Sequence, residues 1–583
     1  MSASIVRHTR VLAGLGLLLL VTPPLRAQDT SPWSVLERPR TRPAQPTSRA
    51  ITPDDLRSRL YVFADDSMAG RELDTRGNAM GVEYIAREAA RIGLVPAGDH
   101  GSFFQTIPLV YRDFDSTRTI ALDGRTLIPW ADFIPRDQGE GTRSIDGVPS
   151  VYGGTWGVPG SLIDAQAAAG KLVVLSLVPA GYGQGIPGTA ARAEVSARFP
   201  DAAGFAVAGL DVMPVQIIPY YRDSPAEFST TGPAPSFLYI RKSVAAALLG
   251  ASLDSLTPGA RGRSFTGTPV FRSRPLEFPG RNVVGIIPGS DPSLRGEYVA
   301  IGAHNDHIGL SEAAYPHDSL YVVNHLYRPQ GADGPEPRLT AARADTVNRI
   351  LADIRKRTDG RSARPDSINN GADDDGSGSM GVLEIAEWFA GAPIKPKRSL
   401  LFIWHVGEEE GLFGSEYFTD HPSVPRDSIV AELNMDMIGR GARTDVTGET
   451  RTGLLIRGDS NYVQLVGSRR LSTELGNLAE LVNGSSGHPL RFDYAMDANG
   501  HPQEIYCRSD HYEYARYGIP IVFFTTGGHA DYHQVTDEPQ YIDYDRMARV
   551  SRFVAELAGS IANLDHRVVV DQPKPDPHGE CRQ

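Results

Sequence analysis

Residues 400–411 read LLFIWHVGEEEG, and this stretch says most about the fold. Its first seven residues form a continuous apolar run, which is typical of a strand buried on both faces of a sheet. Gly407 and Gly411 then flank three glutamates, so the chain is expected to turn directly after the strand. We therefore predict a buried central strand that ends in an acidic turn.

Strand-like and helix-like patterns alternate along the chain from residue 281 onward. The predicted elements are strands at 283–287, 298–302, 400–406, 429–433 and 520–525 and a helix at 379–389. This alternation predicts an α/β fold, with a mostly parallel sheet and helices on both of its faces. Sheets of this kind bind ligands at the carboxyl ends of their strands, and several polar clusters follow the predicted strands.

The composition is that of an ordinary globular protein. Of the 583 residues, 41% are hydrophobic and 22% are charged, which excludes a disordered chain and predicts more than one domain. The net charge of −12 disfavours binding to nucleic acid and to anionic membrane surfaces. We expect no nucleic-acid partner, and the composition leaves the oligomeric state open.

Residues 1–27 have the pattern of a secretory signal peptide. Basic residues precede the apolar run 11–21, and Ala27 offers a small residue for cleavage. A single membrane anchor is the alternative, but a bilayer span takes about 20 residues and this run is shorter. We therefore predict a secreted or periplasmic protein without stable membrane insertion after cleavage.

Shifts in composition divide the remaining chain. Short β-branched runs with many glycines and prolines predict a β-rich module inserted at 116–275. The segment 310–367 is too long for a plain connection and is interpreted as a lid-like insertion. The other predicted parts are a linker at 28–48, the first part of the main domain at 49–115, its remainder at 276–567 and a tail at 568–583.

The two cysteines, Cys507 and Cys581, leave two alternatives open. In an exported protein they can pair and tie the tail to the body of the molecule. They can also remain as two separate thiols. Neither cysteine shows the arrangement with histidine and asparagine that marks a nucleophile.

Five polar clusters supply histidines and carboxylates without cysteine. Their candidate site residues are His304, Asp306, Asp374, Glu408, Glu409, Asp436 and His533. Imidazole and carboxylate without thiolate are typical of a hydrolytic zinc site rather than a structural one. A further carboxylate beside a ligand can serve as the base for a reacting water.

Alternative interpretations exist for several of these motifs. A run of acids is ordinarily a solvated loop or a calcium loop. Ser509-Asp510-His511 suggests a hydrolase triad, but adjacent residues rarely face one another and no Gly-x-Ser-x-Gly turn surrounds the serine. We interpret that motif as structural or substrate-lining. The histidines interpreted as packing or surface residues are His307, His405, His501 and His529.

The ordered motifs resemble the co-catalytic di-zinc aminopeptidase family, whose relatives include glutamate carboxypeptidase and glutaminyl cyclase. The motifs are Gly-x-His-x-Asp, Asp-Asp-x-Ser-Gly, Glu-Glu-x-Gly-Leu-x-Gly-Ser, Met-Asp-Met and His-x-x-x-Asp, within residues 281–564. The insert, with Gly-Lys-Leu-Val-Val at 170–174, resembles a protease-associated domain. The resemblance implies a zinc-exopeptidase fold with such a domain inserted.

The resemblance also implies a set of metal ligands. His304 and Asp436 would bind one of two zinc ions, and Glu409 and His533 would bind the other. Asp374 would bridge the two ions. The resemblance also implies that Glu408 would be the general base.

Two further roles follow only from the resemblance. Asp306 would support the ring of His304, and Tyr506 would polarise the scissile carbonyl as a tyrosine does in some relatives. The paired cysteines that flank that tyrosine in those relatives are absent here. The long segment after Gly309 also departs from the compact members of the family.

The sequence thus predicts a secreted zinc exopeptidase that removes N-terminal residues from peptides. Clusters rich in aspartate and glutamate suit the ammonium group of a substrate, whereas a carboxypeptidase needs arginine for the substrate carboxylate. Arg440 and Arg508 lie near the motifs and argue for the opposite direction. The alternatives are a dipeptidase or carboxypeptidase on the same metal core, a glutaminyl cyclase, and a receptor-like module without activity.

Overall fold

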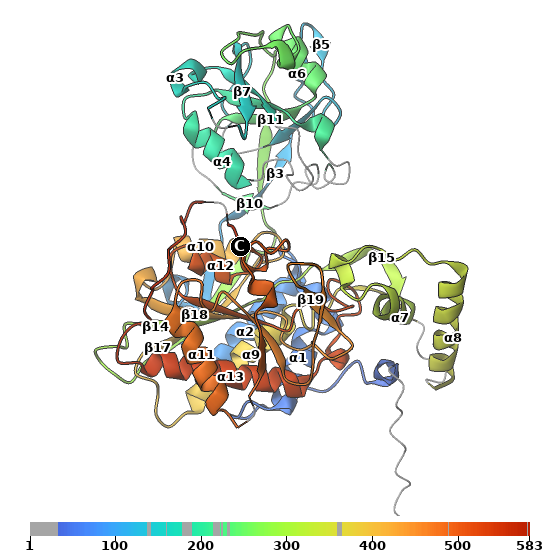
Figure 1. Ribbon diagram of the computed structural model, residues 1–583, viewed down its shortest axis with the longest axis vertical. Helices are drawn as coiled ribbons and strands as arrows, with labels where there is room; N and C mark the ends of the chain where they lie inside the picture. The colour runs from blue at the N-terminus through green and yellow to red at the C-terminus, as the bar shows by residue number, and fades with distance from the viewer. Residues whose placement is uncertain are drawn as a thin grey trace, which may run out of the picture.

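The computed structural model is built around one nine-stranded sheet (Figure 1). Its strands follow the order β1 (Val95–Pro96), β13 (Arg281–Ile287), β17 (Ser399–His405), β14 (Tyr298–His304), β18 (Ile429–Met435), β23 (Ile521–Thr525), β21 (Tyr462–Val466) and β22 (Arg491–Asp493), while β2 (Phe104–Thr106) also pairs with β13. The structure describes residues 33–136, 142–158, 160–177, 189–213, 218, 222, 226–229, 234–357, 364–487, 489–579 and 581–583.

The four central strands of this sheet are parallel. Strand β14 lies between β17 and β18 and is parallel to both, and β18 is parallel to β23. Strands β13 and β21 flank this group and pair antiparallel with β17 and β23. The predicted α/β fold is confirmed, with antiparallel pairs added outside the parallel centre. The parallel centre places four strand carboxyl ends at one edge of the sheet.

Helices cover both faces of the sheet. On β17, Leu400, Phe402 and Trp404 face one apolar cluster, whereas Leu401 and Ile403 face another. The first cluster includes helices α1 (Pro53–Phe63), α2 (Arg76–Ile92), α9 (Gly376–Gly391) and α13 (Tyr544–Asn563), and the second includes α10 (Phe413–Asp420) and α12 (His511–Ala515). All seven residues of β17 are buried, as its apolar run predicts.

Local sequence signals set the ends of the first helices. The Thr52 hydroxyl accepts the backbone N–H of Asp55 (3.1 Å), and Pro53 opens α1. Such a threonine cap contributes about 1 kcal/mol of stability. Helix α2 stops at Gly93, whose φ of 93° is the left-handed conformation that glycine adopts without strain.

A second, five-stranded sheet lies wholly within residues 116–275. Its order is β6 (Phe133–Arg136), β11 (Ser236–Ile240), β9 (Gly204–Ala208), β8 (Leu172–Leu177) and β7 (Ser150–Trp156). The chain leaves the main domain along β3 (Leu109–Phe114) and returns along β12 (Phe271–Pro275), and these two strands pair antiparallel. Figure 1 shows this β-rich unit standing above the main domain on β3 and β10 (Glu227–Phe228).

The described residues of 310–367, namely 310–357 and 364–367, form a further excursion at the side of the main domain (Figure 1). Antiparallel strands β15 (Leu310–Pro316) and β16 (Pro365–Ile368) enclose helices α7 (His317–Tyr327) and α8 (Ala341–Arg357). Tyr321 of α7 and Leu351 of α8 share an apolar cluster with Tyr541 of the main domain. The excursion is therefore packed against the main domain beside the loop that carries His533.

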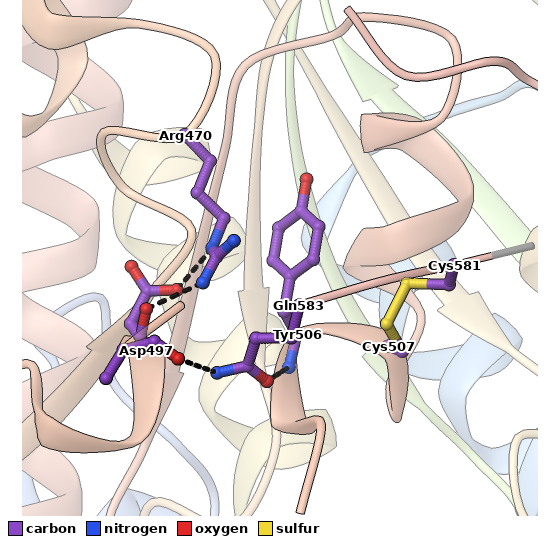
Figure 2. The surroundings of a disulfide bond; sticks show 7 residues. Arg470, Asp497, Tyr506, Cys507, Cys581 and Gln583 are labelled. Carbon is purple, nitrogen blue, oxygen red and sulfur yellow. Dashed lines mark hydrogen bonds and ion pairs between the residues drawn. A yellow bond between two sulfur atoms is a disulfide. The ribbon is translucent and has the colours of Figure 1, made fainter. Parts of the chain in front are cut away.

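A disulfide joins Cys507 to Cys581, which settles the alternatives left open by the sequence (Figure 2). Close to it, the side-chain oxygen of Gln583 accepts the backbone N–H of Tyr506 (2.9 Å). The amide nitrogen of Gln583 donates to the carbonyl oxygens of Met496 and Ala498. The tail is thus fixed along the segment 496–507.

The predicted signal peptide at 1–27 lies outside the described residues. Within the described part of the chain, no helix has the length and apolar character needed to cross a membrane.

Candidate metal centre

The ends of the parallel strands bring the predicted site residues together. His304 is the last residue of β14, and Asp436 directly follows β18. Glu408 and Glu409 follow β17 in the predicted acidic turn, where Gly407 has a φ of 72°. These residues converge because adjacent parallel strands end at the same edge.

All five predicted metal ligands lie within one cluster. The two oxygens of Asp374 face different imidazoles: Oδ1 is 3.2 Å from Nε2 of His304, and Oδ2 is 3.0 Å from Nε2 of His533. Asp436 adds an oxygen 3.7 Å from His304 Nε2, and Glu409 adds one 2.9 Å from His533 Nε2. Asp374 therefore stands between two imidazole–carboxylate pairs.

The chemistry of this cluster fits divalent cations. In the described structure, Nε2 of His304, Nε2 of His533 and Oδ1 of Asp436 are buried without a hydrogen-bond partner. Buried polar atoms are normally satisfied, and several buried carboxylates together need positive charge. Imidazole nitrogens and carboxylate oxygens without thiolate are ligands that zinc accepts.

The neighbouring aspartates support the cluster through the backbone. Asp375 accepts the N–H groups of His304, Gly378 and Met437, at 2.8–3.2 Å, so both of its oxygens are already bonded. One oxygen of Asp537 accepts the N–H groups of residues 373 and 374. Asp374 is thus the acid of this run whose carboxylate faces the histidines.

Asp306 lies beside the ring of His304 and also contacts the acidic turn. Its carboxylate lies 3.7 Å from Nδ1 of His304, which is longer than a hydrogen bond. Its two oxygens instead accept the backbone N–H groups of Glu408 and Glu409, both at 3.3 Å. Asp306 therefore fixes the acidic turn more directly than it fixes the His304 ring.

His307 belongs to the cluster and is buried there, so it is not a surface residue. Its Nδ1 lies 2.6 Å from Oε1 of Glu409, and its ring is 5.4 Å from that of His533. Its Nε2 has no hydrogen-bond partner in the described structure. The available signal was its position three residues after His304, in the turn that follows the same strand.

The environment moves the pKa values of the two adjacent glutamates apart. Burial raises the pKa of Glu408 well above its usual value despite the nearby His304, and Asp436 and Glu409 raise it further. Burial acts the same way on Glu409, but His533 and His307 lower the pKa of that carboxyl to about 2. The two carboxyls therefore have different surroundings: two imidazoles face Glu409, whereas both acidic groups and His304 act on Glu408.

A pocket opens onto Glu408, Glu409, Asp374 and Asp436. Apolar side chains form one part of its wall, namely those of Met437, Val446, Met496, Ile505 and Phe523. The pocket thus combines an acidic end with an apolar side.

Ser509, Asp510 and His511 do not form a triad. The Ser509 hydroxyl donates to Asp436 (2.8 Å) and accepts from Asn434 (3.1 Å). The His511 ring instead stacks on Phe523, with 4.6 Å between the ring centres. Ser509 therefore orients a predicted metal ligand and lines the pocket, in agreement with its structural interpretation.

Tyr506 lies away from the metal ligands. Its ring belongs to the apolar cluster that contains Tyr512, and the guanidinium of Arg470 lies 4.5 Å above it (Figure 2). Among the described residues that line the pocket, Ile505 and Arg508 come from this turn and Tyr506 does not. Apolar packing holds the ring, so the carbonyl-polarising role implied by the resemblance finds no support in this geometry.

The tyrosine that does line the pocket is Tyr532. Its ring stacks on that of His533, with 4.1 Å between the ring centres. Its position directly before a predicted ligand was the only signal for it in the sequence.

Comparisons with known proteins agree with this geometry. Residues 282–558 match the sequence profile of Peptidase family M28. A probable leucine aminopeptidase of Arthroderma benhamiae is 28% identical over 35% of this chain and 54% of its own length, and leucine aminopeptidase 1 of Neurospora crassa is 28% identical over 42% and 61%. The first curated relatives are thus matched over less than two thirds of their length.

Among solved structures, an aminopeptidase from Aneurinibacillus sp. strain AM-1 is 13% identical, with coverage of 90% of this chain and 98% of that chain and a TM-score of 0.44. The segment 282–558 contains every residue of the ligand cluster, from His304 to His533. Residues 282–558 of the chain are thus similar in sequence to Peptidase family M28.

Proposed function

We propose that the protein is a zinc-dependent aminopeptidase that removes N-terminal residues from peptides. The observation that carries the proposal is the position of Asp374, whose two oxygens face two separate imidazoles. This arrangement suits two cations that share one carboxylate. The M28 profile over the same residues and the leucine aminopeptidases among the relatives support it.

The residues present suit two zinc ions. His304 and Asp436 would hold one ion, Glu409 and His533 the other, and Asp374 both. Zinc at these positions would supply Lewis acidity toward the scissile carbonyl and promote ionisation of the attacking water.

The protein's own residues supply the proton transfer and the binding of substrate. The Glu408 carboxylate takes a proton from the attacking water and returns it to the amine that leaves. Its acidic neighbours attract the free α-ammonium group of the substrate. The apolar wall at Val446, Met496 and Phe523 accommodates the first side chain, so we propose a preference for apolar N-terminal residues.

We further propose that the protein is exported through residues 1–27 to the periplasm or the medium. The disulfide between Cys507 and Cys581 supports an oxidising compartment, because cytosolic proteins rarely keep such a bond.

Acetylation of the substrate's α-amine tests the direction of cleavage. An acetylated peptide is expected to resist hydrolysis, because its uncharged end no longer matches the acidic end of the pocket. Product analysis by mass spectrometry of Leu-Gly-Gly and its acetylated form measures this. Cleavage of the acetylated peptide at the normal rate, together with resistance of the C-terminal amide, would identify a carboxypeptidase instead.

Removal of the β-rich insert is expected to leave zinc content unchanged, because the proposed ligands all lie within 304–533. Asp115 donates its backbone N–H to the carbonyl of Val270 (2.8 Å), and Phe114 faces Phe271 across β3 and β12. Replacement of 116–269 by Asn-Gly should therefore close a hairpin. Elemental analysis of the folded deletion protein provides the measurement, and loss of zinc would show that the insert completes the site.

A point variant distinguishes the effect of losing the insert from the effect of losing its contact with the main domain. Phe228 of β10 packs on Phe413 and Tyr417 of α10, with ring centres 5.3 and 6.3 Å apart. Phe228→Ala in the full chain removes this contact and keeps the insert, so it serves as the matched control for the deletion.

A further inference from the structure

Arg508 is the single basic residue among the described residues that line the pocket. The backbone around it is fixed on both sides: Cys507 is bonded to Cys581, and Ser509 is hydrogen-bonded to Asp436. The pocket therefore carries one guanidinium as well as several carboxylates. A ligand with both a positive and a negative group can interact with both kinds of charge.

The contacts of the Arg508 guanidinium are weak. Its Nη2 lies 3.5 Å from Oδ1 of Asp333 and 3.4 Å from the hydroxyl of Tyr532, and its side chain is 40% exposed. Asp333 is also exposed, and exposed ion pairs of this length contribute little to stability. A guanidinium has five N–H donors in a planar fork, so these two contacts leave donors for a ligand.

The excursion at 310–367 helps to shape this part of the pocket. Its short turn η6 (Gly331–Asp333) lies on Tyr532, where the N–H of Ala332 donates to the Tyr532 carbonyl (3.0 Å). A Cβ atom at Gly331 would lie 2.6 Å from that oxygen, so the close approach requires glycine. Gln330, which directly precedes this turn, and Asp333 line the pocket with Arg508.

We propose that Arg508 and Tyr532 bind a carboxylate of the substrate on the leaving side of the scissile bond. The source that we favour is the α-carboxylate of a di- or tripeptide, because Tyr532 contacts both Arg508 and the proposed ligand His533 and so keeps the arginine close to the metal site. The enzyme would therefore prefer short peptides with a free C-terminus. A planar guanidinium binds a carboxylate through two parallel hydrogen bonds. The aspartates and glutamates near the metal site cannot bind a carboxylate in this way, because they are negatively charged themselves. This inference rests on the proposed aminopeptidase function and names its substrate class.

Four leucine substrates test the proposal: Leu-Gly, Leu-Gly amide, Leu-Asp amide and leucine 4-nitroanilide. We expect kcat/KM for Leu-Gly to exceed that for its amide by about 10–100-fold, mainly through KM, as a charge-assisted hydrogen bond provides. Arg508→Gln should reduce this ratio to near one. Asp333→Asn, the control, removes the competing carboxylate and should not lower the ratio.

Leu-Asp amide distinguishes two sources of the bound carboxylate, namely the C-terminus of the peptide and an acidic side chain. If Leu-Asp amide, rather than Leu-Gly, shows the gain that depends on Arg508, the arginine binds an acidic side chain and the preference for free C-termini is wrong. Equal kcat/KM values for Leu-Gly and Leu-Gly amide, or a ratio that survives Arg508→Gln, would overturn the whole inference. Elemental analysis of each variant confirms that zinc content is unchanged.

A binding measurement separates this inference from the proposed function. Calorimetric titration of the Glu408→Gln protein with Leu-Gly and with Leu-Gly amide gives affinities without turnover. Tighter binding of the free acid, lost in the double variant with Arg508→Gln, supports the inference. Failure of the wild-type protein to hydrolyse any of the four substrates would overturn the aminopeptidase proposal, and the titration would still decide the role of Arg508.

Discussion

Glu408→Gln is expected to lower kcat by about 10²–10⁴-fold and to leave the zinc content unchanged. Glu408 lines the pocket beside Asp374 and Glu409, but the closest contacts to the imidazoles come from those two neighbours. Glutamine keeps the size of the side chain and removes its ability to accept and return a proton. Steady-state kinetics on leucine 4-nitroanilide and elemental analysis measure the two effects.

Glu409→Gln is the matched control for this experiment, because it makes the same chemical change one residue away. Glu409 lies 2.9 Å from His533 and 2.6 Å from His307, so its loss should release metal. If Glu408→Gln loses zinc and Glu409→Gln keeps it, the roles assigned to the two glutamates are reversed.

Asp374→Asn is expected to release both zinc ions and to abolish activity. Both oxygens of Asp374 face imidazoles, whereas an asparagine offers one uncharged oxygen and an NH₂ group that cannot bind a cation. Mutation of a residue that only hydrogen-bonds to a metal ligand typically lowers metal affinity by about 10–100-fold. Loss of a ligand that two ions share should lower the affinity by more than that. Zinc per chain after dialysis, measured by elemental analysis, is the readout.

Asp436→Asn provides the comparison for Asp374→Asn. Asp436 lies 3.7 Å from His304 and makes no such contact with His533, so this variant should lose one ion and keep the other. Retention of two zinc ions by the Asp374→Asn protein would contradict the shared-ligand arrangement. Equal loss of metal from both variants would show that the two sites fill only together.

Several parts of the site were predictable from the sequence because they depend on local pattern. The apolar run before the acidic turn identified β17, and clusters after other strands identified His304 and Asp436. Parallel strands end at one edge, so residues that follow them meet without further information. Residue types pointed to a hydrolytic zinc site, and the role of each proposed ligand came from the resemblance of the ordered motifs to a known family.

Side-chain contacts between distant segments were decided only by the tertiary structure. Asp306 bonds the backbone of the acidic turn, His307 faces Glu409, and apolar packing keeps the Tyr506 ring away from the ligands. These outcomes depend on how loops from different strands approach one another. Spacing along a single segment carries no such information.

The disulfide and the contacts of Arg508 were also decided only by the tertiary structure. Cys507 and Cys581 are 74 residues apart, and Arg508 and Asp333 are 175 residues apart. Sequence by itself determined the α/β fold and the ligand types, because hydrophobic periodicity and residue chemistry are local properties. The tertiary structure decided which side chains meet around the pocket, because that depends on strand order and on how the excursion at 310–367 packs beside His533.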